Sequence, residues 1–153
     1  MKNNIEVKIK YVSSKIGREI APPFYATGGS AGMDLSACIE GPVTLKPGEK
    51  AVIPTGIAIQ LPSNESVALI FARSGLGIKR GITMSNGVGV IDSDYTGEIM
   101  CGLINLGDED YTVQPGDRIA QMVFMPIAIA SLVPVTELQS TKRGSGGLGS
   151  TGN

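Results

Sequence analysis

Hydrophobic and polar residues alternate, or form short apolar runs, along most of this chain. The segment from Ile5 to Tyr11 alternates apolar and polar residues, which is the period of a strand with one buried face. Further short apolar segments, each bounded by turn residues, lie at Val43 to Leu45, Ala51 to Leu61, Val67 to Ala72, Val88 to Ile91, Glu98 to Leu106, Arg118 to Met125 and Ile127 to Val135. No helical periodicity continues beyond two turns, and only one short helix is expected, after Arg73. The pattern therefore predicts an all-β protein, a sandwich or barrel of many short strands.

The composition is that of one ordinary globular domain. The chain has 153 residues, of which 42% are hydrophobic and 18% are charged, and its formal net charge is −1. This balance argues against broad affinity for nucleic acids or membranes. The first residues contain no apolar segment typical of a secretion signal, and no apolar run is long enough to span a bilayer. A cytoplasmic location is therefore expected.

The residue types present restrict the chemistry. The chain contains no histidine, which removes histidine-ligated zinc, Ser-His-Asp triads and histidine general bases. Cys38 and Cys101 lack the spacing of a metal or redox motif, and both are expected to be buried, reduced thiols. Any catalysis must therefore use carboxylates, tyrosine or a bound metal ion.

Positive charge is concentrated in one region. The segment from Ser66 to Ile91 contains Arg73, Lys79 and Arg80 but no acidic residue, which indicates either a local anion site or one basic face. The sequence Arg73-Ser74-Gly75 favours the anion site, because it follows a buried-looking strand and brings a guanidinium, a hydroxyl and backbone N–H groups together. Ser74 is expected to cap the short helix, and this group of donors suits a phosphate chain.

The segment from Asn86 to Ile99 has two apolar arms around a polar centre, which predicts a hairpin. If the centre is extended, Asp92 and Asp94 share one face and Tyr95 points to the other. Aspartates at such a place commonly form turns. Near an anion site, however, a carboxylate is costly unless it holds a metal or activates water.

Three remaining features are weak evidence for a functional site when each is taken alone. Asp34 lies in a small, apolar setting at the start of a strand, and Gln121 lies inside a strand otherwise built for the core. Residues 139–153 are rich in glycine and serine and contain Arg143. This segment is either a disordered terminus or an arm that closes over a ligand. We expect residues 1–138 to form the catalytic core and residues 139–153 to form a flexible arm.

Taken together and in order, five segments closely resemble the five motifs of the trimeric deoxyuridine triphosphatases (dUTPases). They are Ala31 to Ala37, Arg73 to Leu76, Asn86 to Ile99, Arg118 to Phe124 and Arg143 to Gly152. The resemblance implies a distorted jelly-roll subunit in a homotrimer whose active sites are shared between chains. It also implies Mg²⁺-assisted hydrolysis of dUTP to dUMP and pyrophosphate, by attack of water on the α-phosphorus. This reaction limits uracil in DNA and supplies dUMP for thymidylate synthesis.

The resemblance also implies roles for residues at the matching positions. Asp92 would orient and deprotonate the attacking water, and Tyr95 would lie against the deoxyribose and leave no room for a 2′-hydroxyl. Asp34 would help to place Mg²⁺ through a water molecule. The other implied substrate-binding residues are Arg73, Ser74, Gly75 and Gln121 at the phosphate chain, Asn86 and Gly89 at the uracil edge, Val90, Ile91 and Met100, and, in the arm, Arg143, Ser145, Gly147, Leu148, Gly149, Ser150 and Thr151.

The chain departs from the resembled family at Leu148, where phenylalanine usually stacks over uracil. Weaker closure of the arm is therefore expected.

Two alternatives to a dUTP-hydrolysing enzyme remain. A relative of dCTP deaminase shares the fold, but its motifs differ from the sequences at Arg73 to Gly75 and at Val90 to Tyr95. A non-catalytic regulator would use the dUTPase scaffold to bind another protein, and the presence of Asp92 and Arg73 argues against it.

Overall fold

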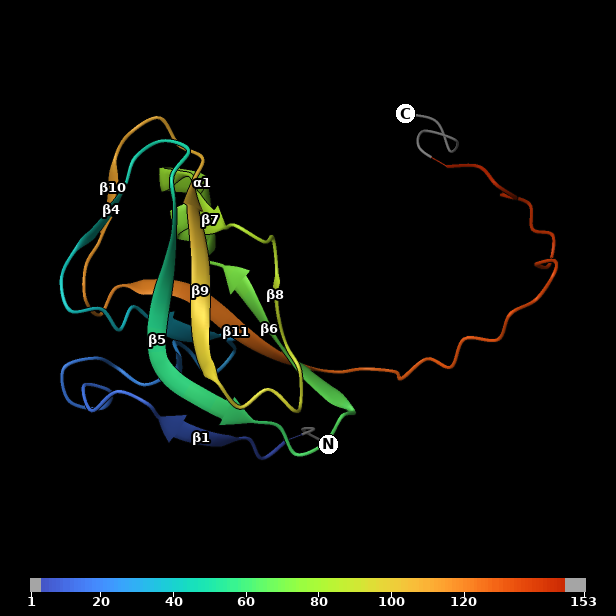
Figure 1. Cartoon of the computed structure of the whole chain (residues 1–153), viewed down its shortest axis with the longest axis horizontal. Helices are drawn as coiled ribbons and strands as arrows, with labels where there is room; N and C mark the ends of the chain where they lie inside the picture. The colour runs from blue at the N-terminus through green and yellow to red at the C-terminus, as the bar shows by residue number, and fades with distance from the viewer. Residues whose placement is uncertain (1–3, 148–153) are drawn as a thin grey trace.

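The computed structural model describes residues 4–147. Within them the chain forms eleven strands and one short helix, which confirms the predicted β class and the single helix after Arg73 (Figure 1). None of these residues belongs to a helix that is long and apolar enough to cross a membrane. The elements are β1 (Lys8–Tyr11), β2 (Phe24–Tyr25), β3 (Met33–Ser36), β4 (Val43–Leu45), β5 (Lys50–Gln60), β6 (Ser66–Ala72), α1 (Ser74–Arg80), β7 (Ile82–Met84), β8 (Gly89–Ile91), β9 (Glu98–Asn105), β10 (Tyr111–Val113) and β11 (Arg118–Pro126).

The strands form two larger sheets and one small one. One sheet has the order β1-β5-β9-β7, the second has the order β2-β3-β11-β6-β8, and β10 pairs with β4. All of these pairings are antiparallel. The sheets are not closed on one another among the residues described, so the predicted closure into a jelly-roll barrel is not confirmed. Strands far apart in the sequence nevertheless become neighbours, and β11 lies between β3 and β6.

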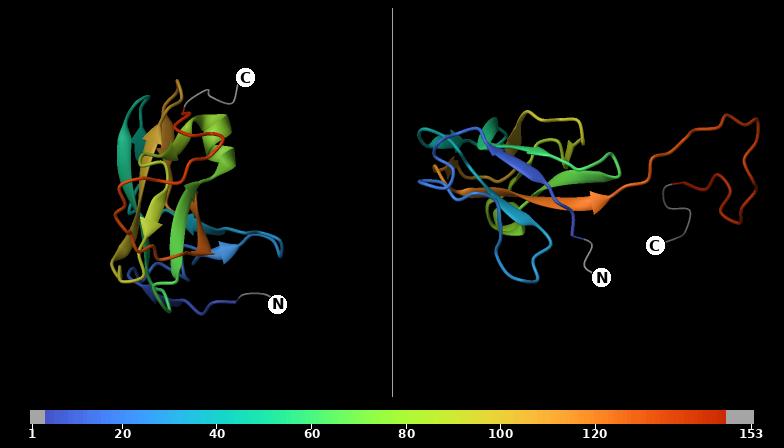
Figure 2. Two further views of the ribbon diagram at one scale, coloured as in Figure 1. Left: turned by 90° about the vertical axis from the view of Figure 1, so that its right-hand side faces the viewer. Right: turned by 90° about the horizontal axis from the view of Figure 1, so that it is seen from below.

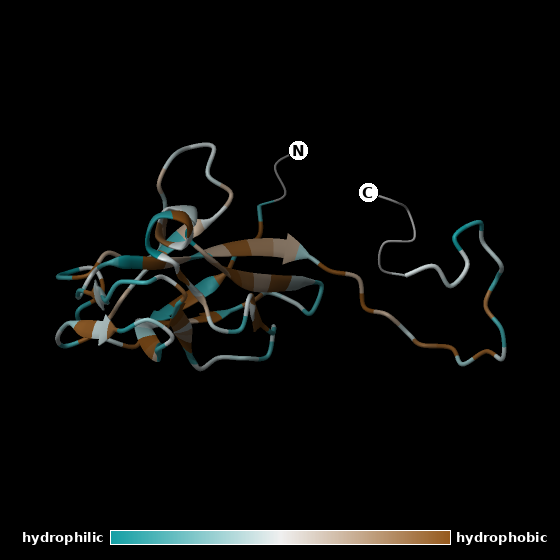
Figure 3. Cartoon of the chain, turned by 90° about the horizontal axis from the view of Figure 1, so that it is seen from above, coloured by the Kyte–Doolittle hydropathy of each residue, from teal (hydrophilic) through white to brown (hydrophobic). Residues whose placement is uncertain are grey.

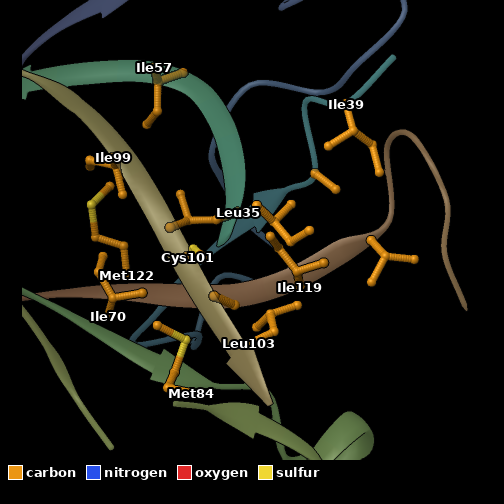
Figure 4. Packing of buried hydrophobic residues seen from close by; sticks show 14 of the residues in the cluster. Leu35, Ile39, Ile57, Ile70, Met84, Ile99, Cys101, Leu103, Ile119 and Met122 are labelled. Carbon is orange, nitrogen blue, oxygen red and sulfur yellow. The ribbon is translucent and has the colours of Figure 1, made fainter. Parts of the chain in front are cut away.

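The core forms because alternate residues of the strands are apolar. In β9, the side chains of Ile99, Cys101 and Leu103 are buried, whereas Met100 between them is exposed. Figure 4 shows the buried side chains of both larger sheets gathered in one cluster, with Leu35, Ile70, Ile119 and Met122 contributed by the five-stranded sheet. Complete burial of one such side chain stabilises the folded state by about 1.5–3 kcal/mol. The alternation therefore determines which face of each strand turns inward.

The two cysteines differ in burial. Both thiols are free, but Cys101 is buried and Cys38 is only half-buried. Burial raises the pKa of the Cys101 thiol to about 12, so this side chain stays neutral and packs as a small hydrophobic group. The predicted buried, reduced thiol is confirmed for Cys101 and only in part for Cys38.

The chain leaves the body of the protein after β11. The N–H of Ile127 still donates to the carbonyl oxygen of Glu65 at 2.9 Å, but Ile129, Leu132 and Leu138 are 64%, 91% and 88% exposed. Figures 2 and 3 show this partly apolar segment running away from the sheets. Several large apolar side chains are therefore exposed to solvent along one extended segment.

Candidate functional site

A polar pocket lies where β3, β6 and β11 meet the start of α1. β6 ends at Ala72, and the next residue leads directly into α1. The cavity has a volume of about 280 Å³ and is lined by Ala26, Ser30, Ala31, Gly32, Asp34, Arg73, Ser74, Gly75, Arg118 and Gln121. The pocket therefore brings together every residue that the sequence analysis assigned to the phosphate chain outside the arm, and the predicted metal-placing carboxylate.

Asp34 lies at the centre of the charged groups in this pocket. Its Oδ1 accepts a hydrogen bond from Arg73 Nε and its Oδ2 accepts one from Arg118 Nη1, both at 2.9 Å, and the residue is only 7% exposed. Arg73 Nη1 also donates to the carbonyl oxygen of Arg118 at 3.2 Å. Two guanidinium groups around one carboxylate leave one net positive charge. Their remaining N–H donors suit an anion with several oxygen atoms, such as a phosphate.

Sequence reasoning did not assign Arg118 to the site. This residue opens β11 and pairs with Ser36, close to Asp34 in β3. The available signal was its place at the start of the segment that contains Gln121. Its contact with Asp34 joins residues 84 positions apart, so it depends on a pairing of strands that local sequence does not specify.

The start of α1 differs from the predicted cap. Arg73 occupies the N-cap position without a capping side-chain hydrogen bond, and Ser74 is the first helical residue. The first hydrogen bonds of the helix are donated by the N–H groups of Leu76 and Gly77 to the carbonyl oxygen of Arg73. The N–H groups of Ser74 and Gly75 precede them and lie in the pocket wall, where no intrahelical acceptor exists for them. A Cβ on Gly75 would meet nothing within 4 Å, so a ligand has room beside the backbone.

Gln121 is fixed from two sides. Its Nε2 donates to the carbonyl oxygen of Ala72 at 3.1 Å, and its backbone pairs with that of Asp34 across β11 and β3. A Cβ on Gly32 would lie 2.9 Å from Gln121 Oε1, so only glycine leaves room for the amide there. The polar residue inside an apolar strand is therefore directed into the pocket wall rather than into the core.

The β8–β9 segment, residues 86–98, is not the predicted hairpin. β8 pairs with β6, whereas β9 pairs with β5 and β7, so the segment crosses from one sheet to the other. One reason is Gly89, where a Cβ would lie 3.0 Å from Cβ of Ile70, so that glycine permits the close approach of β8 to β6. The chain then turns between Asp92 and Tyr95, whose N–H donates to the Asp92 carbonyl oxygen at 3.1 Å. Asp92 and Asp94 therefore lie at a turn and not on one extended face.

The predicted nucleotide-binding residues of this segment, and Met100 just after it in β9, are largely accessible. Asp92 and Asn86 are exposed and Ile91 is half-buried. Val90 is 60% exposed, and Tyr95 and Met100 are 44% and 45% exposed. These side chains give the segment an apolar surface beside an accessible carboxylate, which suits an aromatic or sugar ring.

The pocket and Asp92 lie at opposite ends of β6. Ala68 pairs with Ile91, which places Asp92 beside Val67, six positions before Arg73. At ~3.3 Å per residue this separation is ~20 Å along the strand. One chain therefore does not bring Asp92 to its own pocket, and the predicted site residues form two separate groups.

The arm contributes a third group. Residues 127–147 run away from the body (Figure 1), and this segment contains Arg143, Ser145 and Gly147. Within the described part of the chain, Arg143 Nε donates to the nearby carbonyl oxygen of Gly146 at 3.1 Å. The structure does not bring these residues to either of the other groups within one chain. The remaining predicted arm residues, Leu148, Gly149, Ser150 and Thr151, lie outside the residues described.

The pocket offers few protein ligands for a metal ion. Among residues 4–147 no three histidine, cysteine, aspartate or glutamate side chains gather into a metal site. Asp34 is the one carboxylate in the described pocket lining, and both of its oxygens accept hydrogen bonds from arginine. Such a donor set fits a cation that keeps much of its water and takes ligands from a phosphate chain, as Mg²⁺ does. It does not fit a cation held by several protein carboxylates.

The chain is similar to known proteins over nearly its whole length. Residues 18–152 match the dUTPase family. A deoxyuridine 5′-triphosphate nucleotidohydrolase of Desulfitobacterium hafniense is 51% identical over 98% of each chain, and one of Tolumonas auensis is 48% identical over 96% of this chain and 97% of the relative.

Two solved structures extend the comparison. A mutant dUTPase of Staphylococcus bacteriophage 80alpha with dUpNHpp has a TM-score of 0.84 and 27% identity, covering 97% of this chain and 99% of the other. A mutant dUTPase from phage phi11 of S. aureus, described with a structural Mg(II) ion, has a TM-score of 0.76 and 25% identity, covering 88% of this chain and 99% of the other.

The fold and the pocket define a layered β protein with a polar pocket that holds two arginines and one aspartate. The matches to known proteins show the family of this chain, because they cover nearly its whole length and reach 51% identity. The chain belongs to the dUTPase family.

Proposed function

We propose that this protein hydrolyses dUTP to dUMP and pyrophosphate. The observation that carries the proposal is the group of Asp34, Arg73 and Arg118 in the pocket, with both arginines 2.9 Å from the carboxylate. In a chain of the dUTPase family, a preorganised cationic pocket of this kind supports binding of a triphosphate. Positioning and charge neutralisation carry most of phosphoryl-transfer catalysis, so the pocket also supports the reaction.

The β8–β9 segment supplies the groups for the nucleoside and for water. We assign Asp92, exposed at the turn, as the general base that orients and deprotonates the attacking water, because a base must be accessible at the reacting centre. Asn86 and Gly89 are assigned to the uracil edge, and Val90, Ile91 and Met100 are assigned to substrate binding without a more specific role. Tyr95 is assigned to the deoxyribose, where its ring would exclude a 2′-hydroxyl.

We assign Mg²⁺ as the cofactor, and the donor set in the pocket fits it. Asp34 would hold the hydrated ion through water, and the triphosphate would supply the inner oxygen atoms. When bound, the ion would neutralise charge on the phosphate chain. Arg73, Ser74, Gly75 and Gln121 would hold the phosphates from the pocket wall.

We further propose a homotrimer with shared active sites. Support comes from the ~20 Å between Asp92 and Arg73 along β6, because a complete site then needs the pocket of one copy and the β8–β9 segment of another. A groove of about 1100 Å³, lined by apolar residues of β1 and β11 such as Ile9 and Phe124, lies open in one chain. The exposed apolar segment from Ile129 to Leu138 matches its chemistry. The arm that follows would carry Arg143, Ser145 and Gly147 to a neighbouring copy.

The direct test is pyrophosphate release from dUTP, compared with release from UTP, dCTP and dTTP. We expect hydrolysis of dUTP in Mg²⁺, a much lower rate in EDTA, and poor use of the other three nucleotides. Similar rates for all four would contradict the proposed specificity. Release of ammonia from dCTP would instead identify a deaminase, and tight nucleotide binding without turnover would identify a non-catalytic regulator.

Replacing Leu148 with phenylalanine is expected to tighten nucleotide binding. Leu148 lies outside the residues described, so this prediction rests on the sequence alone. Base-to-aromatic stacking is worth roughly 1–3 kcal/mol, of which leucine recovers only part by burial. The measurement is KM and kcat/KM for dUTP in both proteins. If neither changes, the stacking argument fails.

A further inference from the structure

The side chain of Tyr95 is tied to the backbone of its own segment. Its phenolic oxygen donates a hydrogen bond to the carbonyl oxygen of Glu98 at 2.8 Å, while its N–H donates to the Asp92 carbonyl oxygen at 3.1 Å. The ring is nevertheless 44% exposed. An exposed tyrosine normally rotates freely, and these two bonds restrict both its backbone and its ring to one arrangement.

Gly97 makes this arrangement possible. A Cβ on Gly97 would lie 2.7 Å from the phenolic oxygen of Tyr95 and 2.8 Å from Cζ, which is far closer than van der Waals contact permits. The backbone of Gly97 is not in the left-handed region, so alanine is compatible with its conformation. The absence of a side chain therefore matters at this position because the phenol ring occupies the space.

The side chain of Glu98 holds in place the backbone whose carbonyl group accepts the hydrogen bond from Tyr95. Its Oε1 accepts a hydrogen bond from the N–H of Gly56 at 2.8 Å. Gly56 lies where the register of β5 and β9 shifts, and it has a φ of +71°. The hydroxyl of Thr55 donates to the carbonyl oxygen of Ile99 at 2.6 Å in the buried interior. The start of β9 is therefore held to β5 by one carboxylate contact and one buried hydroxyl contact.

We propose that Gly97 and Glu98 are positioning residues for Tyr95, and that through it they set the discrimination between deoxyribonucleotides and ribonucleotides. This inference rests on the proposed function, in which Tyr95 packs against the deoxyribose. A ring that closes against Gly97 and is anchored to the Glu98 carbonyl group cannot move aside for a 2′-hydroxyl. Neither residue needs to touch the nucleotide.

The experiment compares Glu98→Ala with Glu98→Gln. Alanine removes the acceptor for the Gly56 N–H, whereas the glutamine side-chain oxygen retains it. The measured quantity is kcat/KM for dUTP divided by kcat/KM for UTP. A misplacement of about 1 Å can cost ~10²-fold in rate, so we expect Glu98→Ala to lower this ratio by about tenfold and Glu98→Gln to stay within about twofold of the original protein.

A second pair of variants tests the contact between Gly97 and Tyr95. Gly97→Ala should displace the ring and lower the same ratio by about tenfold or more. Gly41→Ala is the matched control, because a Cβ at Gly41 meets nothing within 4 Å and its backbone is also outside the left-handed region. It should leave the ratio unchanged.

Melting temperatures of the variants distinguish an effect on the position of Tyr95 from an effect on the stability of the fold. If Glu98→Ala and Gly97→Ala lower the melting temperature or the overall rate but leave the dUTP-to-UTP ratio unchanged, their roles are structural and the inference is overturned. If the unmodified protein does not hydrolyse dUTP, the proposed function has failed instead. The two failures are thus distinguishable in one set of assays.

Discussion

Asp92→Asn is expected to lower kcat for dUTP hydrolysis by at least ~10²-fold, because a positioned general base typically contributes 10²–10⁴-fold. Asparagine has the same shape but cannot accept the proton of the attacking water. Binding of dUTP should be nearly unchanged, since the groups that we propose to bind the phosphates lie in the separate pocket. Single-turnover rates in Mg²⁺ and the dissociation constant of a non-hydrolysable dUTP analogue measure the two effects independently.

Asp94→Asn is the matched control for this prediction. Asp94 lies in the same turn and is also exposed, and its substitution removes the same charge. We expect kcat of the Asp94→Asn variant to remain within about twofold of the kcat of the unmodified protein, because no catalytic proton transfer is assigned to Asp94. A near-normal rate for Asp92→Asn, or an equal loss for Asp94→Asn, would show that the base has been assigned wrongly.

Asp34→Asn is expected to raise KM for dUTP by about 10- to 100-fold, because a hydrogen bond to a charged group is worth ~1.5–3 kcal/mol and each 1.4 kcal/mol corresponds to tenfold. In the unmodified protein the Asp34 carboxylate accepts hydrogen bonds from both Arg73 and Arg118 at 2.9 Å, and the residue is largely buried. Asparagine offers one acceptor oxygen and no charge. The two guanidinium groups would then repel one another and lose their alignment.

Glu40→Gln provides a control for loss of an ion-paired carboxylate away from the pocket. Glu40 accepts from Lys15 Nζ at 2.6 Å on the surface, where the Glu40 side chain is 92% exposed. Such exposed pairs contribute little, so KM should not change. An unchanged KM in Asp34→Asn would mean that Asp34 does not organise the pocket.

The Asp92→Asn and Asp34→Asn variants, when refolded together, also test whether each active site is shared between two chains. If each site takes its pocket from one chain and Asp92 from another, an equal mixture of Asp92→Asn and Asp34→Asn chains regenerates some intact sites. Random assembly of a symmetric oligomer predicts roughly a quarter of the original activity. Activity no greater than the mean of the two separate proteins would place both halves of the site in one chain.

The sequence was a good guide to local features of the site. Arg73, Ser74 and Gly75 follow a strand and enter a helix, as their order predicted. It was a poorer guide at the β8–β9 segment. Two apolar arms around a polar centre suit a hairpin, but the arms pair with different strands. Hairpin prediction assumes that neighbouring arms pair with each other, and here β6 offered β8 an alternative partner.

The sequence by itself determined the β class, the short helix and the residue types available for chemistry. These follow from local periodicity and from composition, because alternation of polar and apolar residues acts over only a few positions. The tertiary structure alone decided that Asp34 lies between Arg73 and Arg118, and that Asp92 lies at the far end of β6. Both depend on pairings between strands distant in sequence, and such pairings are selected by burial of the whole core rather than by any local signal.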